Sequence, residues 1–127
     1  MSIQAKYQAV LNLGEELGAK EGAVTEANGV LTITGTVANQ YEKNLIWDKI
    51  KEIGGAEPSD IVADIRVENN DVYAKYVVQK GDTLGKIAKH FYGEPMKYTQ
   101  IFKANTDILE HPDKIEVGQE LVIPFEQ

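Results

Sequence analysis

The residue types that carry most enzyme chemistry are scarce in this chain. It has no cysteine, and its two histidines, His90 and His111, lie outside any metal-binding spacing such as His-Glu-x-x-His. Ser2 and Ser59 lie outside any nucleophile-elbow motif, and no phosphate-binding glycine loop with Gly-Lys-Ser/Thr is present. We therefore expect no enzyme, no catalytic residue, no disulfide and no obligatory cofactor.

The second half of the chain begins with the pattern of a strand followed by a helix. Tyr76 to Gln79 is rich in β-forming residues and predicts a strand that ends at Gly81. Asp82 is a candidate N-cap for the helix, which Gly93 should end. The residues at positions i, i+3, i+4 and i+7 of this helix form its buried stripe: Leu84, Ile87, Ala88 and Phe91.

A second helix and a second strand complete the pattern of this half. Pro95 suits the first turn of a helix. The helical spacing continues at Tyr98, Ile101, Phe102 and Asn105. After a polar loop, residues 121–123 predict a strand that Pro124 ends. The second half is therefore a strand-helix-helix-strand unit.

This unit resembles a LysM domain. The family pattern opens with an aromatic residue and Gly-Asp-Thr-Leu, continues through Ile-Ala and an Asn, and closes with Gly-Gln-x-Leu-x-Ile-Pro. The matching residues are Tyr76, Val78, Gly81, Asp82, Thr83, Leu84, Ile87, Ala88, Asn105, Gly118, Gln119, Leu121, Ile123 and Pro124. The chain departs from the pattern at Val117, where the family usually has proline, but Gly118 can still adopt a positive φ.

The resemblance implies binding of glycans that contain N-acetylglucosamine, such as chitin or peptidoglycan fragments, in a shallow groove between two loops. The implied residues are Gly81, Asp82, Thr83 and Leu84 in the first loop and Asn105, Thr106, Asp107, Ile108 and Leu109 in the second. Backbone polar groups could meet the acetamido groups while Leu84 and Ile108 supply apolar contact. A purely structural interpretation stays open, with Asp82 capping a helix, Leu84 in the core and Asn105 closing a turn.

Composition restricts the partners and the location. The chain has 127 residues, enough for one medium or two small domains, and its net charge of −7 disfavours nucleic acids and anionic membranes. No apolar run approaches the about 20 residues of a membrane span. The N-terminus lacks the basic start and apolar core of a signal peptide. We expect a cytoplasmic monomer.

The first half of the chain alternates helical and strand patterns. Apolar spacing predicts an amphipathic helix over residues 2–18. Two strands, residues 23–27 and 30–36, flank Asn28-Gly29, which is typical of a type I′ hairpin turn. Asn39 and Glu42 resemble a capping box that starts a second helix, and Gly54-Gly55 should end that helix. The last element is a strand over residues 61–67, which alternates apolar and polar residues.

This first half resembles a BON domain. The likeness rests on the second strand, the helix after it, the Gly54-Gly55 stop and the Ile-Arg-Val that ends at Val67. The expected fold class is α+β, with a BON-like α-β-β-α-β sandwich followed by a LysM β-α-α-β domain. The expected boundaries are 1–68 for the BON-like domain, 69–75 for a short linker and 76–127 for the LysM domain.

The order BON then LysM resembles that of small bacterial potassium-binding proteins, as does the stretch Leu109-Glu110-His111-Pro112-Asp113-Lys114-Ile115. The resemblance implies K⁺ binding. Several backbone carbonyls suit this large cation best, and they leave no side-chain motif, so the ion's ligands are not assignable from sequence. Three functions stay open: a potassium-ion binder or sensor, a module for N-acetylglucosamine glycans, and a protein-interaction adaptor.

Overall fold

The fold was analysed in a computed structural model, which describes residues 2–126. The chain forms two compact units, one ending at Asn70 and the other beginning at Asp71. Each unit combines helices with a small β-sheet, which confirms the predicted α+β class.

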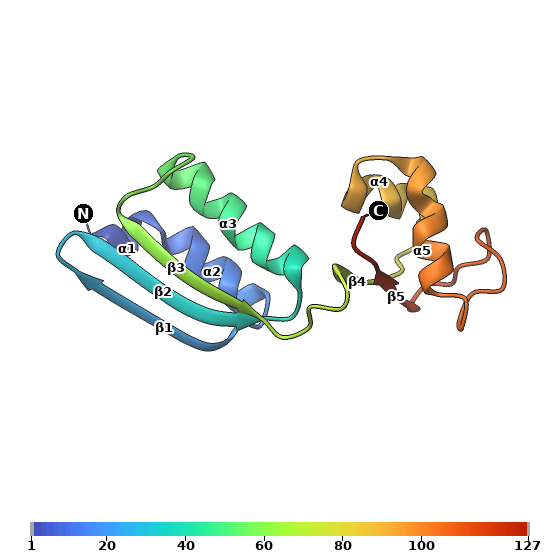
Figure 1. Cartoon of the computed structure of the whole chain (residues 1–127), viewed down its shortest axis with the longest axis horizontal. Coiled ribbons are helices and arrows are strands. Elements are labelled where there is room, and N and C mark those ends of the chain that lie inside the picture. The colour runs from blue at the N-terminus through green and yellow to red at the C-terminus, as the bar shows by residue number, and fades with distance from the viewer. Residues whose placement is uncertain (1, 127) are drawn as a thin grey trace. The chain divides into compact units, whose positions relative to one another are not determined.

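In the N-terminal unit, helices cover one face of a three-stranded sheet (Figure 1). The sheet has the order β1-β2-β3, in which β1 runs antiparallel and β3 parallel to β2. The elements are α1 (Ile3–Lys6), α2 (Gln8–Glu16), β1 (Lys20–Ala27), β2 (Val30–Val37), α3 (Gln40–Gly54) and β3 (Ile61–Val67). This sequence of elements is the predicted α-β-β-α-β order, with one difference in the first helix.

The helix predicted over residues 2–18 is broken at Tyr7, where φ is −102° and ψ is 19°. The Tyr7 side chain is fully buried, and its hydroxyl donates a hydrogen bond of 2.5 Å to Asp60 Oδ1. Asp60 lies 53 residues further along the chain. The break therefore lies at a residue held by tertiary contacts, which helical periodicity does not report.

The hairpin between β1 and β2 follows the prediction. Asn28 has a φ of 55° and Gly29 a φ of 77°, as both positions of a type I′ turn require. Along β2, alternate residues are buried against the helices, among them Leu31, Ile33 and Val37. The hydrophobic pattern thus sets which face of the sheet the helices cover.

The predicted capping box at the start of α3 is confirmed, except that Glu42 bonds to a backbone N–H one residue earlier than expected. Asn39 Oδ1 accepts a hydrogen bond of 3.0 Å from the backbone N–H of Glu42. The Glu42 carboxylate reaches back to the N–H of Ala38 at 3.1 Å, one residue before the cap. Ile46 and Ile50 then bury the inner side of α3.

The C-terminal unit packs its helices beside a two-stranded antiparallel sheet (Figure 1). Its elements are β4 (Ala74–Val77), α4 (Leu84–Tyr92), a 3₁₀ turn η1 (Pro95–Lys97), α5 (Tyr98–Ala104) and β5 (Glu120–Ile123). The strand expected from Tyr76 begins earlier, at Ala74, which is fully buried and pairs with Ile123. The expected linker over residues 69–75 thus includes the first residues of this strand.

Two glycines of this unit have the backbone conformations expected of them. Gly93 ends α4 in the left-handed region, with a φ of 77°. Gly118 has a φ of 94°, so the turn before β5 keeps its positive φ although Val117 replaces the family's proline. Only glycine adopts such values without steric cost from a Cβ atom.

Gly14 offers a test of helix packing in the N-terminal unit. It lies inside α2, and a Cβ atom added there would meet nothing within 4 Å. We expect Gly14→Ala to raise the free energy of unfolding of this unit by about 0.5–1 kcal/mol, because alanine loses less backbone entropy. Urea unfolding followed by the fluorescence of Trp47, the single tryptophan, measures this change. A lower urea midpoint would contradict the described packing.

Candidate functional site

The first implied loop is organised by the Asp82 carboxylate. Asp82 Oδ2 accepts a hydrogen bond of 2.6 Å from the Tyr76 hydroxyl and one of 2.7 Å from the backbone N–H of Gln79. Both bonds lower the pKa of Asp82, and the one from Tyr76 is the larger cause. The Tyr76–Asp82 bond is also the largest cause that raises the pKa of Tyr76. Asp82 therefore closes the turn after β4.

The prediction that Asp82 caps the following helix is wrong. The N-cap of α4 is Thr83, whose Oγ1 accepts a hydrogen bond of 3.1 Å from the N–H of Lys86. Both residue types cap helices well, and the contact between Asp82 and Tyr76 decides between them. Gly81, with a φ of 86°, supplies the left-handed backbone just before them.

The second implied loop is organised by the side chain of Asn105, which is 1% exposed. Its Nδ2 donates to the carbonyls of Ile101 at 2.7 Å and Val122 at 2.8 Å. Its Oδ1 accepts from the N–H of Val122 at 2.9 Å. The amide thus joins the end of α5 to β5, and all of these partners are backbone groups of the fold.

The nine residues implied for glycan binding divide into two kinds. Leu84 and Leu109 are each 2% exposed, so with Asn105 they contribute their side chains to the core. The solvent-exposed members are Gly81, Thr83, Thr106, Asp107 and Ile108, while Asp82 is partly exposed. Ile108 is a large apolar side chain with 45% exposure. The structure thus leaves backbone groups, short polar side chains and Ile108 available to a ligand.

The Tyr76–Asp82 bond makes the stability of this unit depend on pH. The pKa of Asp82 is held below 3.8. The ionised Asp82 therefore contributes to the free energy of unfolding above that pH, and this contribution is lost as pH falls through the lowered pKa. The pKa of Tyr76 is raised above 10.0. The neutral Tyr76 hydroxyl therefore contributes to the free energy of unfolding below that pH, and this contribution is lost as pH rises through the raised pKa.

We expect Tyr76→Phe to lower the free energy of unfolding of the C-terminal unit by about 1 kcal/mol between roughly pH 5 and pH 9. The difference from the native chain should shrink as pH falls below about 4 towards the lowered pKa of Asp82, and as pH rises above about 10 towards the raised pKa of Tyr76. Urea unfolding followed by NMR across this pH range measures it. A loss of stability that stays constant at every pH would refute the charged hydrogen bond as its cause.

Aromatic side chains form a cluster beside the turn after β4. Sequence analysis did not predict this cluster. Tyr73 contacts Phe91 and Phe125 edge to face, at ring-centroid distances of 6.4 and 5.7 Å. The Tyr92 hydroxyl donates to the carbonyl of Pro124 at 2.5 Å, and burial is the largest cause that raises the pKa of Tyr92 to about 12. The rings come from three separate segments, so only the folded chain brings them together.

The N-terminal unit holds a second charged cluster that sequence analysis missed. Asp60 accepts from the Tyr7 hydroxyl and pairs with Lys6 Nζ at 2.6 Å. The hydrogen bond from Lys6, followed by that from Tyr7, lowers the pKa of Asp60.

Within residues 2–126, no three His, Cys, Asp or Glu side chains gather closely enough to hold a metal ion. No described helix has the length and apolar character needed to cross a membrane.

Comparison with known proteins gives a family match for the second half of the chain and two similar proteins that align with most of its length. Residues 76–124 match the LysM domain family, which confirms the LysM prediction. A protein of Escherichia coli O6:H1, the potassium binding protein Kbp, is 39% identical over 122 residues, which are 95% of this chain and 80% of Kbp. The chain belongs to the Kbp family.

A second relative is longer than this chain. An uncharacterized protein of Deinococcus radiodurans is 29% identical over 131 residues, which cover 95% of this chain. The alignment covers 51% of that protein, so this chain corresponds to about half of it.

Proposed function

We propose that this chain is a non-enzymatic binding protein whose ligand is the potassium ion. One observation carries the proposal: the similarity to the potassium binding protein Kbp extends over 95% of this chain at 39% identity. Because the match includes both the N-terminal unit and the LysM region, it supports a function of the complete arrangement rather than of one module.

A weakly hydrated monovalent cation can be held without a side-chain motif. Several backbone carbonyls can replace the hydration shell of K⁺, so such a site needs no carboxylate cluster of the kind a divalent ion prefers. Residues 1–70 hold 6 Lys and Arg against 11 Asp and Glu, a net charge of 6 − 11 = −5. This field raises the local cation concentration. We place the ion in the N-terminal unit without assigning individual ligands.

The proposal includes a cytoplasmic location and a monomeric state. A cytoplasmic K⁺ sensor would respond by population shift, with the ion favouring the conformation that binds it better. The differential affinity of the ion for the two conformations sets the size of this response.

A test of the ion proposal is the stability of the N-terminal unit in KCl and in NaCl at equal ionic strength. Urea unfolding followed by Trp47 fluorescence should show about 2.7 kcal/mol of stabilisation at a hundredfold excess of K⁺ over its dissociation constant. NaCl supplies the matched control for screening. Identical midpoints in the two salts would contradict selective K⁺ binding.

The LysM match favours a second candidate function, binding of an N-acetylglucosamine glycan. The exposed groups of the two implied loops, with Ile108 as the apolar contact, support this reading. The same groups also suit contacts with a protein partner, so an interaction adaptor is the third reading.

Ile108→Ala tests the glycan reading directly. If the loops bind glycan, truncating this side chain should weaken binding of chitin oligomers about fivefold, through the loss of apolar area buried by the sugar. The control is Val117→Ala, since Val117 is an exposed apolar residue, at 68% exposure, outside the implied loops. Equal NMR titration curves for both variants, or no shifts at millimolar oligomer, would reject the glycan site.

A further inference from the structure

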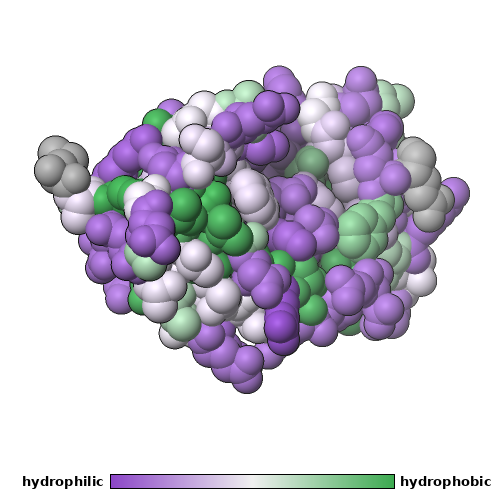
Figure 2. Space-filling model, turned by 60° about the vertical axis from the view of Figure 1, so that its left-hand side comes forward, coloured by the Kyte–Doolittle hydropathy of each residue, from purple (hydrophilic) through white to green (hydrophobic). Residues whose placement is uncertain are grey.

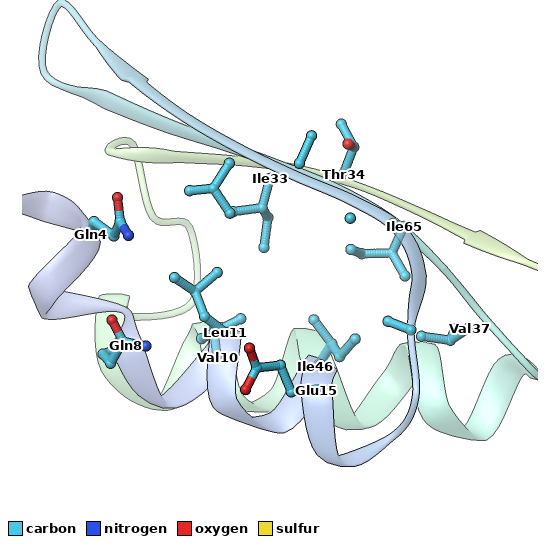
Figure 3. Close-up of a pocket in the computed structure, with 16 residues that line it drawn as sticks. Gln4, Gln8, Val10, Leu11, Glu15, Ile33, Thr34, Val37, Ile46 and Ile65 are labelled. Atoms are coloured by element: carbon cyan, nitrogen blue, oxygen red, sulfur yellow. The ribbon is translucent and has the colours of Figure 1, made fainter.

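The N-terminal unit contains a pocket of about 400 Å³ between α2 and the sheet (Figure 3). Its apolar wall includes Leu11 on α2, Ile33 on β2, Ile46 on α3 and Ile65 on β3. Figure 3 shows these side chains directed into one shared space between the helices and the strands. The volume falls within the range of small-molecule sites in proteins.

Three glycines leave this space open. Gly14 on α2, Gly22 on β1 and Gly35 on β2 all line the pocket, and none has a side chain to fill it. A Cβ atom added at Gly14 would meet nothing within 4 Å, and one at Gly22 would meet only a carbonyl oxygen at 3.9 Å. One added at Gly35 would make ordinary contacts, the nearest with the carbonyl oxygen of Lys20 at 3.7 Å. All residues of strand β1 are solvent-exposed. The pocket is thus a consequence of small residues on facing elements.

The polar groups that line the pocket determine which ligand charge it favours. Glu15 is the one charged side chain among its lining residues, and no Lys, Arg or His lines it. Gln4 and Gln8 add amide groups from the helical side, and Gln8 Nε2 already donates to Asn12. An acidic unit with a single carboxylate at the pocket favours a cationic group and disfavours an anionic one.

Apolar residues also reach the surface of the molecule. In the face that Figure 2 presents, hydrophobic residues form separate patches bordered by hydrophilic ones. An apolar hollow beside one carboxylate suits a small molecule that has both an apolar and a charged part.

We propose that this pocket binds a small amphiphile with an apolar body and a cationic head. The apolar body occupies the space between α2 and the sheet, against the isoleucines of β2, α3 and β3. The ammonium or similar head lies at the Glu15 carboxylate. The inference stands independently of K⁺ binding, since it rests on an apolar cavity and a side-chain carboxylate rather than on backbone carbonyls.

The test uses the full chain with its isoleucine δ-methyl groups labelled for NMR, and octylamine as the probe. Octylamine should produce saturable shifts at Ile33, Ile46 and Ile65, which line the pocket. The methyls of Ile87, Ile101 and Ile123, in the core of the C-terminal unit, serve as internal references and should not shift. Octanol and octanoate, which have the same chain length, separate the contribution of the head group.

Two pairs of variants identify the pocket and its charge. Gly14→Leu fills the pocket and should weaken octylamine binding more than about tenfold. Its control is Ala9→Leu, at an exposed position of α2 outside the pocket. Glu15→Gln should weaken octylamine binding about threefold, without affecting octanol. The matching control is Glu16→Gln, one residue away and also outside the pocket.

Trp47 fluorescence during urea unfolding verifies that each variant folds. Equal affinity of Gly14→Leu and Ala9→Leu for octylamine would overturn the site, as would the absence of saturable shifts in the native chain. Octanoate or octanol binding as tightly as octylamine would overturn the cationic class of the ligand. None of these outcomes bears on the response to K⁺, which is measured without an amphiphile.

Discussion

Replacing Asn105 with alanine should lower the free energy of unfolding of the C-terminal unit by about 3–5 kcal/mol. The substitution removes hydrogen bonds of 2.7, 2.8 and 2.9 Å to Ile101 and Val122. The bond to Ile101 is buried and those to Val122 are partly buried, so water does not fully replace the lost partner. Each unpaired buried group costs about 1–3 kcal/mol. The missing side-chain volume adds a small cavity cost.

NMR-detected urea unfolding of the full chain measures this loss, with the signals of Ile101 and Leu121 as reporters of the unit's core. The control is Thr106→Ala, at the exposed neighbouring position, which should change stability by less than about 0.5 kcal/mol. A loss below about 1 kcal/mol for Asn105→Ala would show that the amide is not the link between α5 and β5.

The same result bears on the glycan reading. The LysM resemblance implies Asn105 as a binding residue, whereas its side chain is engaged entirely with backbone groups of the fold. A variant at this position should therefore impair glycan binding through unfolding. Ile108, which is exposed, is the better position at which to separate binding from stability.

Gly54→Ala should lower the free energy of unfolding of the N-terminal unit by about 2 kcal/mol. A Cβ atom at this position would overlap the Tyr7 hydroxyl and would lie 2.9 Å from Pro58 Cβ. Tyr7 is fully buried and bonded to Asp60, so its ring has little freedom to move away. The overlap therefore outweighs the gain in helix propensity that alanine otherwise brings.

Gly14→Ala is the matched control, because it makes the same change inside a helix where the added methyl group meets nothing. The two substitutions should shift the Trp47 unfolding midpoint in opposite directions. Tyr7→Phe removes the hydroxyl that Cβ would overlap, so Gly54→Ala should cost less in the Tyr7→Phe background than in the native chain. An equal cost in both backgrounds would exclude the hydroxyl as the cause.

Sequence signals predicted the elements wherever the deciding interactions are local. Asn28-Gly29 forms the expected hairpin turn, and Asn39 caps α3 through a residue three positions away. Such signals are readable because both partners lie within a few residues of each other. They also led to the correct strand and helix order in both halves of the chain.

Predictions from sequence were wrong where a residue distant along the chain, or a competing hydrogen bond, determines the local structure. Asp82 and Thr83 are neighbouring residues that both cap helices well, and a hydrogen bond from Tyr76 to Asp82 decides which of them caps α4. Tyr7 interrupts the first helix while its hydroxyl is held by Asp60, 53 residues away. The pocket depends on strand register, which places Gly22 near Gly35, and on the packing of α2, which brings Gly14 to the same space. No local sequence pattern predicts either arrangement.

A backbone amide NMR titration with KCl, beside NaCl at equal ionic strength, tests the central claim most directly. Binding of K⁺ predicts saturable shifts with potassium alone, clustered in the N-terminal unit, and their location would identify the carbonyls that hold the ion. Flat or identical responses to the two salts would contradict the claim and would make N-acetylglucosamine oligomers the next ligand to titrate.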